Sequence, residues 1–585
     1  MTSPLTKLKA ATTRKEVAVL LGIAPKTLAY LLYIRPEAVR YTTFEIAKKN
    51  GSKRQINAPA KDLKDLQRSL ATFLQKCIDE IDATEGYVNT TSHGFTPGKD
   101  IVSNAFPHRS RRYVFNLDLT DFFGTITFRR LRGYFIKDHN FALHEDVATV
   151  VAQIACHQSK LPQGSPCSPI MSNLIGRILD FHLLKLARDN GCTYTRYADD
   201  LTFSTNKKQF PKSIACIKPG EIHAWKVGRQ LAGLIKKCDF EINPAKTRMQ
   251  YKDSRQEVTG LVTNRKINVR SEYRHEVRAM VHRLFTTGSF QISTFSIDAN
   301  GNSAMQEVDG LLDQLHGRLG FIHAIDEGNR KLVTEHPYNY TAWPKKSKPT
   351  GNESIYLRFL LYKLFFANPK PMIICEGKTD NIYLANAIHS LHTTFPQLIK
   401  LDAQGKRVLD VQIFKYADTS TGKILGNESG GAPGLSKLIQ RYVAESRFFT
   451  APLGKHPAIV LIDNDTGATG SGNVYATLTN LKLPKPTGTE PYIHVAKNLY
   501  VVATPLNGAP SSCIEDFFTP ADKAVVIDGK IFDPTDKLDK STHYGKAVFA
   551  HKVIAADPGK IDFSLFPSLI KRLVDVIDHY HASHP

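Results

Sequence analysis

The chain has 585 residues, which is too many for a single hydrophobic core and predicts two or three domains. Lys and Arg outnumber Asp and Glu by 77 to 55, and this net charge of +22 favours a phosphate-bearing partner if the charge is clustered. The sequence shows no signal peptide, no apolar run long enough to cross a bilayer, and eight scattered cysteines without metal-ligand spacing or a disulfide framework. We therefore expect a soluble, cytoplasmic protein with no membrane partner.

A stretch with chemically informative side chains lies at residues 114–123, which read VFNLDLTDFF. Its apolar, strand-like run ends at Asp118. The carboxylate of Asp118 is therefore expected at the edge of a sheet, where other acidic residues can converge on it.

A β-hairpin is predicted around residues 193–204, because β-branched and aromatic residues lie on both sides of the sequence RYADD (196–200). The hairpin would present Asp199 and Asp200 at its tip. Ordinary turn chemistry is the alternative, since Asp is well tolerated and solvated in turns. Together with Asp118, the hairpin predicts three carboxylates around one site.

Three carboxylates at one edge suit the transfer of a nucleotide to the hydroxyl of a growing strand. Such a transfer needs two Mg²⁺ ions to clamp the attacking and leaving oxygens, and these hard cations prefer carboxylate ligands. Asp118 and Asp199 are expected to be the stronger ligands. Asp200 is expected to be the weaker one, because consecutive residues of a strand point to opposite sides. Mn²⁺ could serve the same oxygens.

After this region the pattern becomes helical. Val277, Met280, Val281, Leu284 and Phe285 recur at helical spacing and predict a helix with arginines alongside, and a second helical pattern covers about 305–330. Residues 336–351 break every periodicity and are expected to connect to another unit.

Two buried-strand patterns in the C-terminal part each end in an acidic residue. MIIC (372–375) is followed by Glu376, and AIVLI (458–462) by Asp463. Asp465 can point the same way as Asp463, since strand side chains alternate with a period of two. Ligands of open α/β sheets gather at the carboxyl ends of the strands, so a second acidic site is predicted there, with plain acidic turns as the alternative.

Over about residues 15–330 these motifs resemble the reverse transcriptases, specifically those of bacterial retrons. LPQGSPCSP (161–169) is similar to the loop-and-helix motif beneath the template, KRQINAP (53–59) to the fingers strand, and NPAKT (243–247) to the later palm motif. The resemblance implies that Phe123 packs against the sugar and would clash with a 2′-hydroxyl, so that dNTPs are preferred. The implied substrate-binding residues are Lys53, Arg54, Phe123, Gln163, Gly164 and Tyr197, and the implied catalytic ones are Asp118, Asp199, Asp200 and Lys246.

Two shorter signatures match the retron pattern. NAFPH (104–108) fits Asn-Ala-x-x-His, and residues 258–260 fit Val-Thr-Gly. In that family these regions are associated with recognising the enzyme's own structured RNA. The implied RNA-recognition residues are Asn104, His108, Val258, Thr259 and Gly260. His108 could equally be a structural histidine.

The C-terminal motifs, Glu-Gly followed by Asp-x-Asp, resemble the TOPRIM domain of topoisomerases, primases and the overcoming-lysogenization-defect nucleases over about 365–555. The resemblance implies that Glu376 acts as a general acid or base at a phosphodiester and that Lys546 stabilises the transition state. The implied Mg²⁺ ligands of this domain are Glu376, Asp380, Asp463, Asp465 and Glu515.

The expected fold is an α+β right-hand polymerase with fingers, palm and helical thumb, followed by an α/β TOPRIM domain with a mostly parallel sheet. Expected boundaries are 1–335 for the polymerase (fingers and palm about 15–265, thumb about 266–335), 336–364 for a linker, and 365–585 for the nuclease-like domain. The resemblance implies a cognate noncoding RNA as partner and a branched RNA–DNA product (msDNA). It also implies a nuclease effector for antiphage defence that acts on a nucleic-acid target. A homo-oligomer is compatible with the resemblance. The alternatives are a general bacterial reverse transcriptase whose TOPRIM domain processes the product, and an inactive RNA-binding scaffold.

Overall fold

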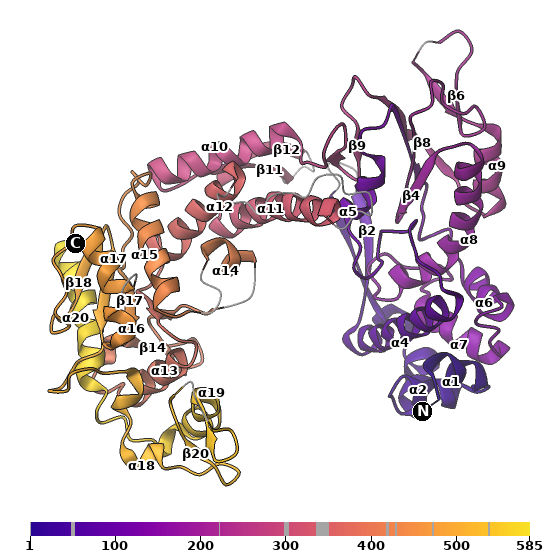
Figure 1. The fold of residues 1–585 in the computed structure, drawn as a ribbon. Coiled ribbons are helices and arrows are strands. Elements are labelled where there is room, and N and C mark those ends of the chain that lie inside the picture. The colour runs from indigo at the N-terminus through magenta and orange to yellow at the C-terminus, as the bar shows by residue number, and fades with distance from the viewer. Residues whose placement is uncertain are drawn as a thin grey trace. The chain divides into compact units, whose positions relative to one another are not determined.

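The computed structural model describes residues 2–47, 53–221, 223–297, 303–334, 350–416, 420–426, 430–470, 473–535 and 539–584. The chain forms two compact units (Figure 1). The N-terminal unit holds the described residues of Met1–Ser271 and Ala324–Trp343, and the C-terminal unit holds those of Glu272–His323 and Pro344–Pro585.

The N-terminal unit is built on a four-stranded antiparallel sheet with the order β4-β5-β3-β8. Its strands are β3 (Tyr113–Leu119), β4 (Thr193–Tyr197), β5 (Asp200–Thr205) and β8 (Ile242–Tyr251). β5 is buried from Leu201 to Thr205, so both faces of the sheet are covered at this central strand. The predicted hairpin is confirmed: β4 and β5 pair directly, with Ala198 and Asp199 as the two residues of the tip.

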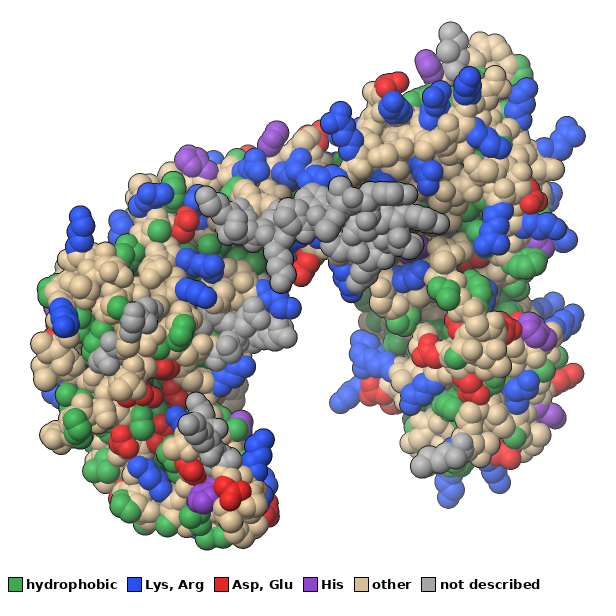
Figure 2. Space-filling view, viewed as in Figure 1, with side chains coloured by type: hydrophobic (Ala, Val, Ile, Leu, Met, Phe, Trp, Pro, Cys, Tyr) green, Lys and Arg blue, Asp and Glu red, His purple; other side chains and the backbone are tan. Residues whose placement is uncertain are grey.

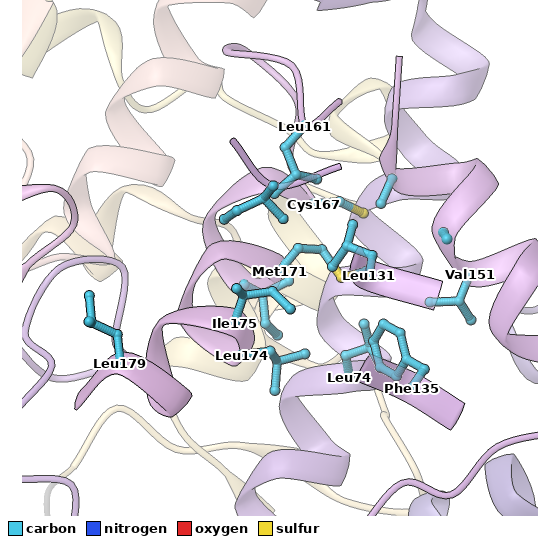
Figure 3. Packing of buried hydrophobic residues seen from close by; sticks show 14 of the residues in the cluster. Leu74, Leu131, Phe135, Val151, Leu161, Cys167, Met171, Leu174, Ile175 and Leu179 are labelled. Atoms are coloured by element: carbon cyan, nitrogen blue, oxygen red, sulfur yellow. The ribbon is translucent and has the colours of Figure 1, made fainter. Parts of the chain in front are cut away.

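Two long helices carry much of the core of this unit. Helix α4 (Lys61–Glu85) buries residues three or four positions apart, including Leu66, Leu70 and Leu74, which is the stripe of a helix packed on one face. Helix α8 (Ser168–Asp189) begins with a proline in its first turn, where a missing N–H costs nothing. Leu74 from α4 and Met171 from α8 pack with Leu131 and Phe135 in the hydrophobic core shown in Figure 3.

The other elements of the N-terminal unit are α1 (Pro4–Ala10), α2 (Arg14–Leu20), α3 (Pro25–Ala29), β1 (Tyr41–Ala47), β2 (Lys53–Pro59), α5 (Ile101–Ala105), α6 (Phe128–Lys137), α7 (Glu145–Ala155), β6 (Ala215–Ile217), β7 (Trp225–Val227), α9 (Arg229–Lys237), β9 (Glu257–Val258) and β10 (Leu261–Val262). Within the described ranges, no single helix is long and apolar enough to cross a membrane. Helix α2 and the segment Pro25–Ile34 together reach the length and apolar composition of a membrane span, but they are bent by 115° relative to one another. Val17 and Leu28 of this pair are buried in the core of the unit.

The C-terminal unit contains a five-stranded sheet with the order β16-β13-β17-β19-β18. Its strands are β13 (Met372–Cys375), β16 (Gln412–Ile413), β17 (Ala458–Ile462), β18 (Ile493–Ala496) and β19 (Leu499–Ala503), and all neighbours are parallel except β18 with β19. β13, β17 and β19 are buried at every position, as expected for parallel strands covered on both faces. Helices α13 (Asp380–Ser390) and α20 (Pro567–Ser583) pack on one of these faces.

The helix expected at 277–285 is present as α10 (Ser271–Thr287), but it packs with the C-terminal unit. The carbonyl oxygen of Phe285 accepts hydrogen bonds from the backbone N–H groups of Thr450 (2.9 Å) and Ala451 (2.8 Å). The ring of Phe285 also contacts Tyr362 and Phe449, with centroids 5.3 and 5.0 Å away. The apolar stripe that predicted a thumb helix is thus buried against Tyr362, which lies within the expected linker, and against residues that follow that linker.

The expected linker at 336–364 contains a buried helix, α12 (Gly351–Leu361), because Phe359, Leu360 and Leu361 are fully buried. Residues 335–349 lie outside the described residues. The other elements of the C-terminal unit are β11 (Gln291–Ile297), β12 (Ser303–Asp309), α11 (Leu312–Thr334, whose last residues belong to the N-terminal unit), β14 (Ile399–Leu401), β15 (Arg407–Leu409), α14 (Ser420–Leu425), α15 (Ala432–Ser446), α16 (Thr466–Thr469), α17 (Val474–Asn480), α18 (Pro520–Lys523), β20 (Ile531–Phe532), β21 (His543–Tyr544) and α19 (Lys546–Val548).

Candidate active sites

The N-terminal sheet gathers the three predicted aspartates at one edge. Antiparallel pairing sets Asp118 of β3 opposite Asp200 of β5, and Asp200 opposite Tyr197 of β4. Directly paired residues share a face of the sheet, so Asp118 and Asp200 point the same way. Asp199 occupies the tip, where its carbonyl oxygen accepts a hydrogen bond from the N–H of Leu119 (3.0 Å).

The carboxylates of this site disfavour one another's negative charge. Burial, followed by the charge of Asp118, raises the pKa of Asp199. Loss of solvent at the site, followed by the charges of Asp199 and Asp118, raises the pKa of Asp200 to about 6. Such shifts are typical of carboxyl groups held close together, and a bound cation would relieve the repulsion.

Lys246 supplies one positive charge at this site. Its Nζ donates to Oδ2 of Asp118 at 2.8 Å, and this hydrogen bond raises the pKa of Lys246. Asn243 donates to the other oxygen of Asp118 at 3.3 Å. Asp118 is only 4% exposed, whereas the side chain of Lys246 is 60% exposed and can turn toward a ligand.

The donor chemistry of this edge fits Mg²⁺, because the carboxylates of Asp118, Asp199 and Asp200 line one cleft and hard divalent cations prefer carboxylate oxygens. Among the side chains that the structure describes, no group of three His, Cys, Asp or Glu residues is already arranged to hold a metal ion. Lys246 occupies Oδ2 of Asp118 with a hydrogen bond in this structure.

A cleft of about 980 Å³ opens above the carboxylates and unites most of the predicted polymerase residues. The predicted residues that line it are Lys53, Arg54, Asp118, Phe123, Gln163, Tyr197, Asp199, Asp200 and Lys246. Gly164 does not line the cleft itself. Its backbone lies very close to a neighbouring side chain, since a Cβ on Gly164 would be 2.9 Å from Cγ2 of Ile56. The loop is fixed to β2 because Asn57 donates its N–H to the carbonyl oxygen of Gln163 (2.8 Å).

Lys and Arg side chains are spread over the face of the N-terminal unit shown in Figure 2, without one dominant patch. Of the two predicted triphosphate ligands, Lys53 forms an exposed ion pair with Glu45 (2.8 Å). Arg54 lines the cleft, and its charge opposes the rise in the pKa of Asp199.

The two shorter signatures pack together behind the hairpin. Helix α5 carries Asn104, and Thr259 and Gly260 form the tip between β9 and β10. The hydroxyl of Thr259 donates to the carbonyl oxygen of Ile101 (3.3 Å). Thr259 has φ +47°, an uncommon value for a β-branched residue, and Gly260 has φ +80°. The structure therefore packs the Val-Thr-Gly turn against α5.

His108 lies inside this arrangement and is fully buried. Its Nδ1 is 2.7 Å from the hydroxyl of Ser204, and its Nε2 is 2.8 Å from that of Thr195. Burial lowers the pKa of His108 to about 3, so the ring is neutral at physiological pH. These contacts support the structural alternative for His108. Asn104 and Val258 are also buried, at 1% and 0% exposure.

Several residues that position the site went unnoticed in the sequence. Gln67 of α4 is fully buried; its amide nitrogen donates to the hydroxyl of Tyr41 (2.9 Å), and its amide oxygen accepts from Ser165 (2.8 Å). It thereby joins β1 to the loop that carries Gln163. Arg196 and Asp180 form a buried pair behind the hairpin tip. No local pattern indicates these roles, because each depends on residues far away along the chain.

A second acidic cluster lies at the carboxyl ends of β13 and β17 in the C-terminal unit. Oε2 of Glu376 accepts the N–H of Asp463 (3.2 Å), and Oδ1 of Asp463 accepts the N–H of Ile514 (2.9 Å). Glu515 is 1% exposed and pairs with Nζ of Lys546 at 3.0 Å. The predicted residues Glu376, Asp463, Glu515 and Lys546 are therefore neighbours.

The charged groups of this second cluster shift one another's pKa values. Burial, followed by the charges of Asp380, Glu515 and Glu376, raises the pKa of Asp463 to about 8. Burial also raises the pKa values of Asp380 and Glu376. Burial alone would lower the pKa of Lys546, but Glu515 outweighs it and the pKa is raised. The donor set again fits a hard divalent cation.

Asp465 is engaged differently from Asp463. It is the N-cap of α16, and its Oδ1 accepts the N–H groups of Gly467 (2.7 Å) and Ala468 (3.3 Å). It also lines a cavity of about 660 Å³ together with Tyr475 and Lys485. Asp465 still raises the pKa of Glu376, so it stands at the margin of the cluster.

Comparisons with known proteins agree with the N-terminal site. Residues 46–270 match the family described as reverse transcriptase (RNA-dependent DNA polymerase). The retron Mx65 reverse transcriptase of Myxococcus xanthus is 35% identical over 292 residues, which is 46% of this chain and 62% of that protein. The retron Mx162 reverse transcriptase of the same organism is 31% identical over 349 residues, covering 55% of this chain and 65% of that protein. The chain thus spans somewhat less than two thirds of these two relatives.

Among solved structures, a telomerase from Candida albicans in complex with a fragment of telomeric RNA covers 56% of this chain and 65% of its own at 9% identity, with a TM-score of 0.32. An apo telomerase from Candida tropicalis gives a TM-score of 0.27 at 12% identity, covering 41% of this chain and 56% of its own. Likeness at these TM-scores carries no weight.

The retron Ec86 reverse transcriptase of Escherichia coli is 30% identical over 316 residues, which is 53% of this chain and 84% of that protein. By its match to the reverse transcriptase family and its similarity to the Ec86 enzyme, the chain belongs to the retron reverse transcriptases.

Proposed function

We propose that the N-terminal unit is an RNA-directed DNA polymerase that copies a cognate noncoding RNA into the DNA of a branched RNA–DNA product. One observation carries the proposal: the cleft that contains Asp118, Asp199 and Asp200 also contains Arg54, Phe123 and Gln163. Metal ligands, a triphosphate-binding cation and a sugar-facing ring are the parts that template-directed nucleotide transfer needs.

The roles of the residues follow from their chemistry. Asp118, Asp199 and Asp200 would hold Mg²⁺, which supplies Lewis-acid stabilisation of the attacking and leaving oxygens when bound. Arg54 presents a fork of donors suited to phosphate oxygens, and Lys53 adds charge. Lys246, once it leaves Asp118, can neutralise or protonate the departing pyrophosphate.

Phe123 would exclude a 2′-hydroxyl from the sugar site by its bulk. Gln163 and Gly164 would bind the incoming nucleotide, and their loop is held in place by Asn57 and, through Ser165, by Gln67. Membership of the retron family supports a cognate RNA as template and an msDNA that stays bound as product. Thr259 and Gly260, which lie at the accessible tip of their turn, support an RNA-recognition surface on the same unit, whereas the buried Asn104 could only position that surface.

The test is to express the chain with its native flanking locus, purify it, digest the bound RNA and look for one discrete short DNA. The band should appear with the unmodified chain and vanish with Asp199→Ala. Asp65→Ala is the matched control, because Asp65 forms only an exposed pair with Arg68 on α4. Absence of the band despite activity on an added primer–template would favour a general reverse transcriptase over a retron enzyme.

For the C-terminal unit we propose a metal-dependent nuclease of the TOPRIM type, which acts as the effector of an antiphage system and is held silent by the bound msDNA. The supporting observation is the grouping of Glu376, Asp463 and Glu515 with Lys546 at the carboxyl ends of parallel strands. Glu376 would transfer a proton at the phosphodiester, and Asp380 would assist the other carboxylates in holding Mg²⁺.

Glu376→Ala separates the two activities. The variant should still make the short DNA and should lose growth arrest in cells challenged with phage. Asp410→Ala is a suitable control, because Asp410 lies in the same unit but pairs with the surface residues Lys370 and Lys400. Growth arrest that persists in Glu376→Ala would refute the effector role.

A further inference from the structure

Phe95 is an aromatic residue in a costly backbone conformation at the polymerase cleft. Its φ is +59°, in the left-handed region that bulky side chains rarely adopt. Its side chain gains little burial in return, since the residue is 46% exposed. Strain that brings no packing gain is typical of a functional position.

The backbone around Phe95 is fixed to the hairpin that carries the aspartates. His93 donates its N–H to the carbonyl oxygen of Arg196 (2.8 Å), and Asn173 donates to the carbonyl oxygen of Gly94 (2.9 Å). A Cβ on Gly94 would lie 2.4 Å from the backbone nitrogen of Ala198. The direction of the Phe95 side chain is therefore set relative to Asp199 by contacts that do not involve its ring.

The ring of Phe95 contacts Phe123, with centroids 6.1 Å apart and planes inclined at 51°. Phe123 also contacts Phe122, whose ring is 5.5 Å away and stacks on Phe240. Phe122 is buried, whereas Phe95 is exposed at the cleft. Phe123 therefore contacts one buried ring and one ring that the cleft leaves open.

Phe95 also separates two spaces. It lines the cleft of about 980 Å³ together with Phe123, and it lines a smaller cavity of about 160 Å³ on the side of Asn173 and Arg196. Removing the ring would join the smaller cavity to the cleft beside Phe123. The side chain of Phe123 would then gain room to leave its present rotamer.

We propose that Phe95 is a specificity-determining residue that holds Phe123 against the sugar of the incoming nucleotide. The inference rests on the proposed polymerase function and deepens it: sugar selection depends on a pair of rings, and the second ring comes from a strained turn before the first strand of the sheet. Ring-to-ring contact supplies the restraint, since aromatic pairs at this separation attract one another.

The test compares incorporation of deoxynucleotides and ribonucleotides by the full-length protein on a primer–template. Phe95→Gly should keep deoxynucleotide incorporation and should raise the relative use of ribonucleotides by about tenfold or more, a typical size for loss of shape discrimination. Phe95→Tyr keeps the ring and should retain the ratio of the unmodified protein. Phe95→Leu keeps apolar bulk without a flat ring and should fall between them.

Folding is checked on the same samples. Glycine adopts φ +59° without strain, so Phe95→Gly should melt at the same temperature as the unmodified protein or higher. Phe181→Ala is the matched control, because Phe181 is 71% exposed on α8 and lines neither space. An unchanged nucleotide ratio in both Phe95→Gly and Phe95→Leu would overturn the proposal, and so would a lower melting temperature in both.

The unmodified protein and Asp199→Ala are measured first. If the unmodified protein incorporates no nucleotide, the polymerase function itself is refuted, and the inference about Phe95 falls with it. If it incorporates deoxynucleotides in an Asp199-dependent way, the outcome for Phe95 bears on sugar selection alone.

Discussion

Arg196 and Asp180 form a buried, two-pronged ion pair directly behind the hairpin tip that carries Asp199. Nε and Nη2 of Arg196 donate to the two carboxylate oxygens at 2.8 and 2.7 Å, and Nη1 donates to the carbonyl oxygen of Ala198 at 3.2 Å. Arg196 is 0% exposed and Asp180 6%. The guanidinium thus links helix α8 to the hairpin tip and so fixes the backbone position of the residues at that tip, including Asp199.

Removing one partner of this pair should damage both folding and activity. Arg196→Met leaves the carboxylate of Asp180 buried and unpaired, so we expect a loss of about 3–5 kcal/mol in the free energy of unfolding and no DNA synthesis. Arg68→Met is the control, because Arg68 pairs with Asp65 at an exposed site on α4 and its loss should cost about 1 kcal/mol or less. Denaturant unfolding of both variants measures the difference; equal losses would contradict this account.

Neutralising one carboxylate of the polymerase site should separate stability from activity. The charges of Asp199 and Asp118 help to raise the pKa of Asp200 to about 6, so Asp200→Asn removes repulsion from the folded state. In the presence of EDTA the variant should melt no lower than the unmodified protein, while nucleotide incorporation with Mg²⁺ should fall by at least about a hundredfold. A clear drop in melting temperature would show that Asp200 has a structural role.

Gly94→Ala tests how closely the turn before the sheet supports the hairpin. The new methyl would lie 2.4 Å from the backbone nitrogen of Ala198, so the hairpin tip or the turn must move. We expect a loss of catalytic rate of about tenfold or more with a nearly unchanged affinity for the template. Gly133→Ala provides the comparison, because a Cβ there meets nothing within 4 Å and should stabilise α6 slightly.

Acid should destabilise the N-terminal unit through its buried histidines. Burial lowers the pKa of His108 to about 3 and that of His93 to about 4, whereas both are near 6.5 in the unfolded chain. Below pH 6.5 the unfolded chain binds protons that the folded unit does not, so stability is complete above pH 6.5 and falls toward the folded pKa values. Each histidine contributes at most about 1.4 kcal/mol per pH unit. In His108→Gln the slope between pH 6.5 and 4.5 should be shallower; an identical slope would show that His108 is protonated while folded.

The pair of Lys546 and Glu515 should stabilise the C-terminal unit. Lys546→Met leaves Glu515, which is 1% exposed, without its cation, and we expect a loss of about 2 kcal/mol or more in the free energy of unfolding. Adding Glu515→Gln should restore much of that loss. Lys552→Met should have little effect, because its partner Asp528 is exposed. Failure of the double variant to recover would mean that Lys546 stabilises the fold by other contacts.

The local parts of the polymerase site could be predicted because each depends on neighbours in the chain. Alternating β-branched and aromatic residues around Ala198 and Asp199 specify a hairpin without help from the rest of the molecule. The run that ends at Asp118 forms β3, and the buried runs before Glu376 and Asp463 form β13 and β17. In each case an acidic residue lies at the end of an apolar strand or directly after it, and this order in the sequence does not depend on how the strands are arranged.

Other features depended on the tertiary structure, because the contacts that create them join distant residues. The sequence shows the stripe of α10, but only packing shows that Phe285 lies against Tyr362 and Phe449. Asp463 and Asp465 have the same strand periodicity, yet β17 ends at Ile462 and Asp465 is used to cap α16.

The sequence by itself determined the family resemblance: acidic residues at the ends of strands, and the motifs KRQINAP and LPQGSPCSP in the order of the retron reverse transcriptases. The tertiary structure decided which side chains hold these motifs in place. Asp180 supports the hairpin tip through Arg196, which is 16 positions away, and Gln67 supports a loop through Ser165, which is 98 positions away. Burial makes these polar contacts strong and specific, and burial is a property of the folded chain that no local pattern of residues contains.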